Sequence, residues 1–203
     1  MSKKPIIVFE GIEGTGKSHH INNVAKYLKK NNKKFIKIRE PGGSMNSEKI
    51  RRLILSNKST FNNYTDLLLY LAARSENIEL IKKNKGKQII LIDRFSDSTL
   101  AYQHYGMGIN LKFITNINNY LLKNINIDYT FLNIVNQENM KKRLTKRKKL
   151  NRYDKFDYSF YNKVQNGFIK ILKKNPKKYM KINSNLSIEN NEQIILNKII
   201  NLI

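Results

Sequence analysis

A glycine-rich segment near the N-terminus has the residue types and spacing of a phosphate-binding loop. It reads Gly-Ile-Glu-Gly-Thr-Gly-Lys-Ser, that is, a glycine, four residues and then Gly-Lys-Ser. Glycines allow backbone N–H groups to turn toward phosphate oxygens, and a helix that follows adds the positive end of its dipole. The pattern predicts nucleoside triphosphate binding but does not identify the phosphate acceptor. The residues predicted to bind the triphosphate are Gly11, Ile12, Glu13, Gly14, Thr15, Gly16, Lys17 and Ser18.

Three side chains in and near this loop suggest specific chemistry. Lys17 is expected to reach the β- and γ-phosphates, and the Ser18 hydroxyl to coordinate Mg²⁺. Asp93 ends the apolar run Ile89–Ile92, so its carboxylate is expected beside the loop, where it would bind the same Mg²⁺ directly or through water. An alternative is that Asp93 caps the helix that follows. The next residue, Arg94, adds a cation at a strand end, where parallel sheets bind ligands.

Strands that alternate with helices are expected to position these residues. The predicted strands are Pro5–Glu10, Lys34–Ile38, Lys87–Ile92, Ile127–Ile134 and Tyr179–Ile182. The predicted helices run from the glycine-rich loop to about Lys30 and over Glu48–Leu55, Asp66–Lys83, Gln137–Lys148, Tyr158–Lys173 and Ile188–Leu202. This alternation indicates one α/β domain over residues 1–203, with a mainly parallel sheet of about five strands flanked by helices.

The composition excludes several classes of protein. No apolar run approaches the roughly 20 residues that cross a bilayer, and the absence of cysteine excludes disulfides and cysteine zinc sites. A cytoplasmic location is the default expectation. The net charge of +24 permits nucleic-acid binding, but 31 of the 39 basic residues are lysines scattered over the whole chain. We therefore expect a solvated lysine surface and no dedicated nucleic-acid partner, with a nucleic-acid-binding P-loop protein as the alternative.

One predicted helix carries an arginine on a face that is otherwise apolar. Tyr70 and Arg74 share this face with Leu67, Leu71 and Ile78. Because an unpaired buried guanidinium is costly, Arg74 must have a partner or a ligand. Tyr70 alone would more often be a residue of the hydrophobic core.

Taken together, the motifs resemble those of the thymidylate kinases, the family that phosphorylates dTMP with ATP. The matching pieces are Gly11-Ile12-Glu13 in the loop, Arg39-Glu40-Pro41-Gly42-Gly43, Tyr70 four residues before Arg74, Asp93-Arg94-Phe95 continuing through Ser98 to Gln103, and a basic segment ending at Leu150–Asp154. The resemblance implies a P-loop kinase fold with a small lid at about residues 141–154, direct in-line phosphoryl transfer, Mg²⁺ as cofactor and a homodimer. Another nucleoside monophosphate kinase is the alternative, and it should differ at Tyr70, Arg74 and Tyr102.

The resemblance also implies roles for an acceptor site. Arg94 would bind the dTMP phosphate, Arg74 would donate to the thymine carbonyl, and Tyr70 would stack on the base, where family members usually have Phe. Glu13 would accept from the sugar 3′-hydroxyl, and Tyr102 would select deoxyribose. The implied dTMP-binding residues are Glu13, Arg39, Arg51, Tyr70, Arg74, Arg94, Ser98, Thr99, Tyr102 and Gln103.

Gly14 makes the lid important for catalysis. Some thymidylate kinases have an arginine at this position in the loop, so here the positive charge on the transferring phosphoryl group must come from elsewhere. The lid offers Arg147, Arg152 and Arg143, which we rank in that order. With Lys17 and Arg94 they complete the predicted catalytic set.

Overall fold

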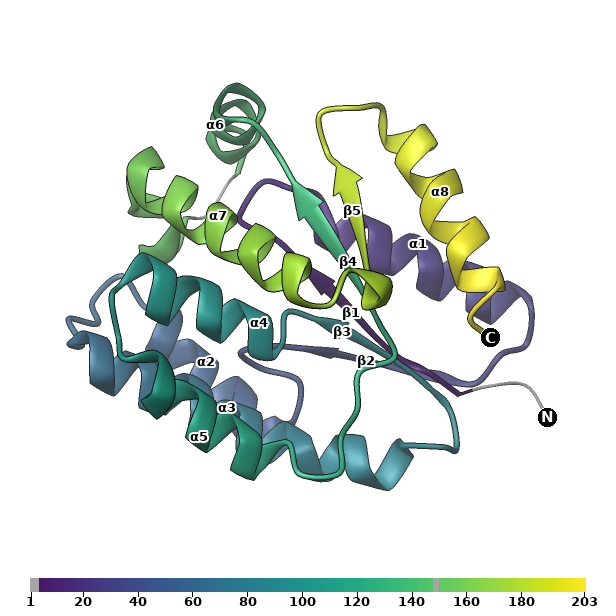
Figure 1. The fold of residues 1–203 in the computed structure, drawn as a ribbon, viewed down its shortest axis with the longest axis horizontal. Coiled ribbons are helices and arrows are strands. Elements are labelled where there is room, and N and C mark those ends of the chain that lie inside the picture. The colour runs from purple at the N-terminus through teal and green to yellow at the C-terminus, as the bar shows by residue number, and fades with distance from the viewer. Residues whose placement is uncertain (1–3, 148–149) are drawn as a thin grey trace.

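The protein forms a five-stranded parallel sheet with helices on both faces (Figure 1). The structure is a computed structural model that describes residues 4–147 and 150–203. The strand order is β2-β3-β1-β4-β5, and every neighbouring pair is parallel. The strands are β1 (Ile6–Glu10), β2 (Phe35–Arg39), β3 (Ile89–Asp93), β4 (Tyr129–Ile134) and β5 (Tyr179–Asn183). The predicted α/β class and five strands are confirmed.

The long helices follow the strands in alternation. They are α1 (Lys17–Lys30), α2 (Met45–Leu55), α3 (Asn63–Asn84), α5 (Leu111–Leu121), α6 (Gln137–Thr145), α7 (Tyr158–Lys174) and α8 (Ile188–Ile200). The short helix α4 (Ser96–Thr99) runs directly into a π-helical segment, Leu100–Gly106, and short 3₁₀ turns occupy Arg152–Lys155 and Pro176–Lys178. Helix α6 ends at Thr145, before the predicted end at Lys148, which lies outside the described residues.

Alternate residues of the central strand β1 enter different cores. Ile7 and Phe9 pack with residues of α1 and α8, whereas Ile6 and Val8 pack with residues of α3 on the opposite face. Because both faces of the sheet are covered, the strand is a continuous apolar run and not an alternating one. Full burial of each such side chain contributes about 1.5–3 kcal/mol to stability.

Most long helices begin with a side-chain cap, but α1 does not. Ser44, Asn62 and Asp157 cap α2, α3 and α7 by accepting from a backbone N–H of the first turn. At the start of α1 the N-cap is Gly16, which has a left-handed backbone (φ 84°) and no side chain. The first N–H groups of α1 therefore have no side-chain acceptor at the cap, and this end of the helix suits an anion.

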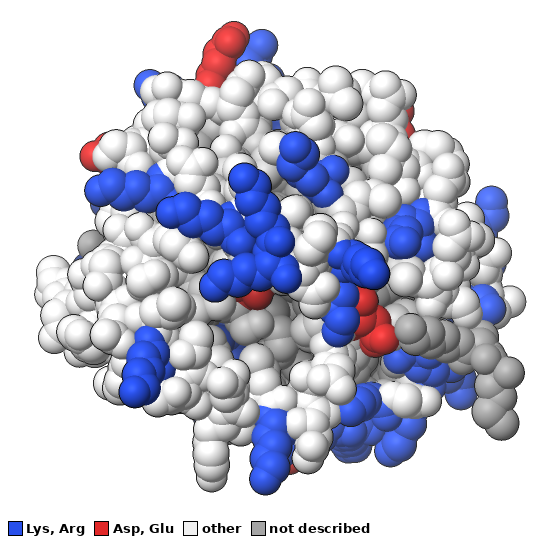
Figure 2. All heavy atoms as spheres, in the orientation of Figure 1, with Lys and Arg blue, Asp and Glu red and all other residues white. Residues whose placement is uncertain are grey.

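The surface carries lysine and arginine side chains at many separate places. Figure 2 shows a group of them near the middle of one face and others scattered around it, with few acidic side chains between them. Within the described residues, no helix combines the length and apolar character needed to span a membrane.

Candidate active site

A cavity of about 200 Å³ lies at the carboxyl ends of β1, β2 and β3. Every residue predicted for the acceptor site lines it, and so do Lys17, Ser18, Asp93 and Arg147. Arg143 and Arg152 do not line it. The remaining lining residues are Glu40, Pro41, Leu55, Phe95, Asn151 and Tyr153. The predicted residues are thus brought together from distant parts of the chain, as expected for a ligand site at this edge of a parallel sheet.

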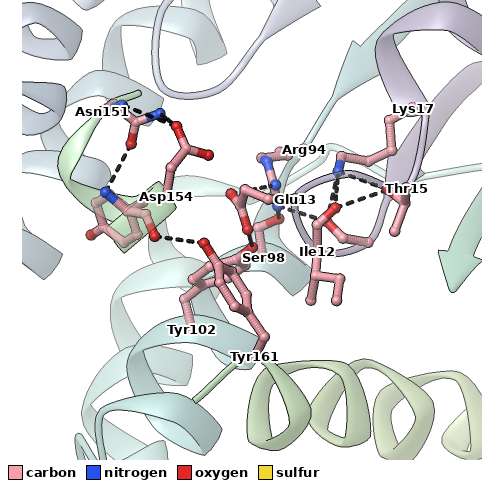
Figure 3. Close-up of polar contacts among 12 residues, drawn as sticks. Ile12, Glu13, Thr15, Lys17, Arg94, Ser98, Tyr102, Asn151, Asp154 and Tyr161 are labelled. Carbon is pink, nitrogen blue, oxygen red and sulfur yellow. Dashed lines mark hydrogen bonds and ion pairs between the residues drawn. The ribbon is translucent and has the colours of Figure 1, made fainter. Parts of the chain in front are cut away.

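The ammonium group of Lys17 is enclosed by the glycine-rich loop (Figure 3). Its Nζ donates to the carbonyl oxygens of Gly11 (2.8 Å) and Ile12 (2.7 Å) and to Thr15 Oγ1 (3.2 Å). Burial, and then the charge of Arg94, lower the pKa of Lys17 to about 7. An anion in the cavity would stabilise the protonated amine, so the site is suited to a phosphate.

Gly11 permits a close backbone approach at the start of the loop. Its φ is 137°, and a Cβ placed there would lie 2.2 Å from the carbonyl oxygen of Asn133 at the neighbouring strand β4. No side chain fits without moving that backbone. The glycine at this position is therefore required by the packing of the loop against β4.

Ser18 and Asp93 meet where the loop approaches β3. Ser18 Oγ donates to Asp93 Oδ2 at 3.1 Å, and both side chains line the cavity. Two oxygen ligands fit Mg²⁺, which prefers oxygen and completes its coordination with water and substrate phosphates. The described residues contain no cluster of three or more His, Cys, Asp or Glu side chains that could enclose a metal on their own. The alternative role for Asp93 is not seen, because the N-cap position of α4 is Phe95.

Glu13 connects the loop to the residues that follow β3. Its Oε1 accepts from Arg94 Nη2 at 2.8 Å, and its Oε2 accepts from the Tyr102 hydroxyl (Figure 3). Burial opposes the charge on Glu13, but Arg94 and Lys17 outweigh it and lower the pKa of the carboxyl group. Arg94 also donates to the Gly11 carbonyl at 2.8 Å. Its backbone is left-handed (φ 66°), a conformation that costs a non-glycine residue about 1–2 kcal/mol.

Arg74 is buried at the wall of the cavity, and four of its five N–H groups have acceptors in Glu40, Thr99 and Asn118. It is 1% exposed, and its Nε and Nη2 both donate to Glu40 Oε2, at 2.9 and 2.7 Å. Thr99 Oγ1 accepts from Nη2 at 2.9 Å, and Asn118 Oδ1 accepts from Nη1 at 2.7 Å. Phe95 lies against the guanidinium, 5.2 Å from its ring centroid to Cζ. The expectation that Arg74 must have a partner is confirmed.

The other predicted acceptor residues differ in how far they are already paired. Arg39 donates twice to the carboxylate of Glu48, at 3.0 and 2.9 Å, and Arg51 donates to the carbonyl of Pro41 at 2.5 Å. By contrast, Gln103 is 1% exposed, and its Nε2 has no partner in the described part of the chain. A buried amide N–H without an acceptor is unfavourable, so Nε2 of Gln103 is a position at which a ligand oxygen could accept a hydrogen bond.

The three lid arginines have different partners. Arg147, whose side chain is 40% exposed, donates to Asp154 at 2.5 Å and lines the cavity. Arg152 pairs with buried Asp66 on α3 and donates to the Ile54 carbonyl at 2.5 Å.

Arg143 lies closer to the glycine-rich loop than the other two. It donates to the carbonyl oxygens of Gly14 (2.9 Å) and Ser184 (2.6 Å). Arg143 is therefore in contact with the loop but outside the cavity, whereas Arg147 has an exposed side chain at the cavity itself.

Glu10 is a buried acid that the sequence did not single out. It accepts from the backbone N–H groups of Phe95 (2.8 Å) and Ser98 (3.2 Å) and from the Ser98 hydroxyl (2.5 Å). It therefore caps α4 from the neighbouring strand, next to Arg94. Burial, and then the charge of Asp97, raise the pKa of Glu10 to about 8.

This pKa predicts that Glu10 makes stability depend on pH. The folded protein binds a proton at Glu10 up to about pH 8, whereas the unfolded chain releases it near 4.5, so stability is lost as pH rises between these values. The loss is at most about 1.4 kcal/mol per pH unit. Glu10→Gln, which resembles the protonated acid, should flatten this slope in urea unfolding at pH 5, 6, 7 and 8. The exposed control Glu79→Gln should keep it, and an unchanged slope in Glu10→Gln would contradict the assignment.

Other residues that line the cavity or contact Arg74 were not predicted as site residues either. Glu40 is part of the Arg39–Gly43 motif but was given no role, and Tyr153 lines the cavity with its ring 5.9 Å from that of Tyr70. The signal for Glu40 was the buried Arg74, which required an acidic partner. Asn118 and Tyr153 had no comparable signal, because their contacts depend on how distant helices and the lid pack.

Comparisons with known proteins give consistent matches. The family model for thymidylate kinase matches residues 9–195. The thymidylate kinase of Thermosipho africanus is 39% identical over 169 residues, covering 82% of this chain and 84% of its own. That of Clostridium novyi is 36% identical over 194 residues, covering 93% and 95%. The crystal structure of thymidylate kinase from Ehrlichia chaffeensis matches with a TM-score of 0.78 at 30% identity, covering 96% of this chain and 97% of that chain.

Proposed function

Because this chain belongs to the thymidylate kinase family and phosphorylates dTMP with ATP to give dTDP, we propose that the cavity is its dTMP site and that the glycine-rich loop binds the ATP phosphates beside it. The observation that supports this most strongly is the junction at Glu13. This residue belongs to the phosphate-binding loop, yet it is paired with Arg94 and Tyr102 of the acceptor cavity. The two substrates would therefore meet at this residue.

On the donor side, Lys17 and the backbone of Gly11–Ser18 bind the triphosphate. The ammonium of Lys17 exchanges its carbonyl partners for phosphate oxygens, and the uncapped start of α1 faces the same anion. We assign Mg²⁺ to Ser18 and Asp93, whose oxygens lie 3.1 Å apart at the cavity wall. When bound, the ion supplies positive charge to the β- and γ-phosphate oxygens.

On the acceptor side, arginines bind the phosphate and a mixed polar and aromatic wall binds the nucleoside. Arg94, with Arg39 and Arg51 nearby, receives the dTMP phosphate through charge-assisted hydrogen bonds. Tyr70 stacks on the base. The base edge meets Arg74, Ser98, Thr99 and the unpaired amide of Gln103, and Tyr102 and Glu13 lie at the sugar.

The lid supplies the remaining cation for in-line transfer. We place Arg147 in this role because, of the three lid arginines, it alone lines the cavity. The side chain of Arg147 is 40% exposed, and Asp154, which is 0% exposed, would keep its hydrogen bonds from the backbone and side-chain amides of Asn151 when Arg147 moves to a phosphate. Arg152 would hold the lid against α3 through Asp66, and Arg143 would support the loop at Gly14.

We also propose that residues 1–203 form one domain and that the protein is located in the cytoplasm.

We further propose a homodimer that pairs through an apolar face of α3 and α5. Tyr64 (54% exposed) and Leu68 (51%) lie on α3, and Phe113 (39%) and Tyr120 (82%) lie on α5, with the Tyr64 and Phe113 rings 6.0 Å apart. An exposed patch of this kind is typical of an interface. Light scattering tests the homodimer, because a mass equal to one 23.9 kDa chain would contradict it.

The substrate assignment is tested with a panel of nucleoside monophosphates in an assay of ADP release. We expect dTMP to have the highest kcat/KM and dUMP to be about 10–200-fold poorer, since the two differ by one methyl group. Faster turnover of dCMP or AMP would contradict the placement of the base. Removal of divalent cations with EDTA should abolish turnover with every substrate, and activity without them would refute the Mg²⁺ assignment.

A further inference from the structure

Tyr153 brings an aromatic ring from the lid to the acceptor cavity. The residue lines the cavity and is only 4% exposed. Its ring centroid lies 5.9 Å from that of Tyr70 at an interplanar angle of 89°, an edge-to-face arrangement that is favourable for two aromatic rings. The side chains of the two tyrosines are also hydrogen-bonded to each other. The lid is therefore in direct contact with the residue of α3 that is proposed to stack on the base.

Tyr153 is held in place by contacts within the protein. Its hydroxyl donates to Oδ2 of Asp66, a residue of α3 that is 2% exposed. Its backbone carbonyl accepts from the Tyr161 hydroxyl of α7 at 2.5 Å. The 3₁₀ turn that carries it begins with a capping box between Asn151 and Asp154. The ring is thus fixed at its hydroxyl, at its backbone and through its turn.

Tyr70 depends on Tyr153 more than Tyr102 does. In the part of the chain that the structure describes, Tyr153 is the only aromatic ring paired with that of Tyr70. The Tyr102 ring also contacts Tyr153, at 6.0 Å, but it packs in addition against Phe160 and Phe168. Removal of the Tyr153 ring would leave Tyr102 with two ring contacts and would release the ring of Tyr70.

We infer that Tyr153 is a positioning residue of the acceptor site, which holds the Tyr70 ring where it stacks on the base. The inference rests on the proposed placement of the base against Tyr70. A ring that is already held in its stacking orientation loses less side-chain freedom when the ligand binds, so the ligand binds more tightly. A residue of the lid thereby contributes to the affinity for dTMP even in the absence of ATP.

The test is a double-mutant cycle in which titration calorimetry measures the Kd for dTMP without ATP. Tyr153→Leu should weaken dTMP binding by a factor of about 3–10, the range expected for one aromatic pair. In the Tyr70→Leu background, the same change should alter the Kd by less than about twofold, because the ring that Tyr153 positions is absent. The Kd for ADP should stay within about twofold of the wild-type value in Tyr153→Leu, since the change lies in the acceptor cavity.

The outcomes separate this inference from its premise. If Tyr70→Leu binds dTMP as tightly as the wild type does, the base does not stack there and the proposed placement is wrong. If Tyr70→Leu weakens binding but folded Tyr153→Leu does not, the positioning role of Tyr153 is refuted. An equal effect of Tyr153→Leu with and without Tyr70, or an equal loss of affinity for ADP, also refutes it, because Tyr153 would then not act through Tyr70.

Two further variants complete the test. Leu150 belongs to the same segment of the lid, is 45% exposed and does not line the cavity, so Leu150→Ala should keep the wild-type Kd for dTMP. A loss in Leu150→Ala as large as that in Tyr153→Leu would contradict the inference. Should Tyr153→Leu fail to fold, Tyr153→Phe removes only the hydroxyl group that joins Asp66 to Tyr70. It should weaken dTMP binding in the wild-type background and not in Tyr70→Leu, and equal effects in both backgrounds would refute the role.

Discussion

Replacing Arg147 with alanine is expected to lower kcat by on the order of 10³-fold, with a small change in KM for dTMP. An arginine that reaches the transferring phosphoryl group increases the rate by a factor of about 10³–10⁵. Gly14, inside the phosphate-binding loop, cannot supply such a charge because it has no side chain. The effect should fall on kcat, because this contact forms in the transition state and not in the ground-state complex. Steady-state ADP release with saturating ATP measures it.

A matched control separates this role from general disturbance of the lid. Lys146 is the exposed neighbour of Arg147 and does not line the cavity, so Lys146→Ala should keep kcat within about twofold. An unchanged kcat in Arg147→Ala would move the role to Arg152 or Arg143. Given their partners, that result would require Arg152 to leave Asp66, or Arg143 to leave the Gly14 and Ser184 carbonyls, when substrates bind.

The second large effect is expected at Lys17. Lys17→Met should lower kcat/KM for ATP by on the order of 10²–10³, the usual loss when one preorganised donor to a developing charge is removed. The protein should remain folded, because burial already lowers the pKa of this amine to about 7 and an apolar side chain avoids that penalty. Kinetics with varied ATP measure the loss, and thermal unfolding checks the fold.

Lys30 is the matched control for Lys17. It lies at the other end of α1 and is exposed, so Lys30→Met changes the same charge on the same helix without altering the loop. Its kcat/KM for ATP should equal that of the wild type. Equal losses in the two variants would show that overall charge governs ATP binding, and would contradict the specific role of Lys17.

Much of the fold and the cavity could be predicted because the signals are local. The five apolar runs became strands with ends displaced by at most two residues, and the turn after β1 is a contiguous motif. Carboxyl ends of parallel strands meet at one edge, so residues after β1, β2 and β3 were expected together. The cavity at that edge contains every predicted acceptor residue, although their contacts with ligands stay predictions.

The remainder depends on packing between distant segments. Asn118 is one of many asparagines in the chain, and its pairing with Arg74 spans 44 residues. Glu10 resembled the end of an apolar strand, and its role as a cap arises only because α4 starts beside β1. The π-helical turn at Leu100–Gly106 has no sequence signal of its own, yet it carries Tyr102 and Gln103.

The left-handed backbone of Arg94 has a consequence for directed evolution of this protein. Glycine adopts that conformation without steric cost, so Arg94→Gly would recover about 1–2 kcal/mol of backbone strain. The same change would leave the buried carboxylate of Glu13 without its cation, at a cost of about 3–5 kcal/mol. A library screened only for heat resistance should therefore retain arginine at this codon despite the strain, and stabilising substitutions should be found elsewhere in the chain.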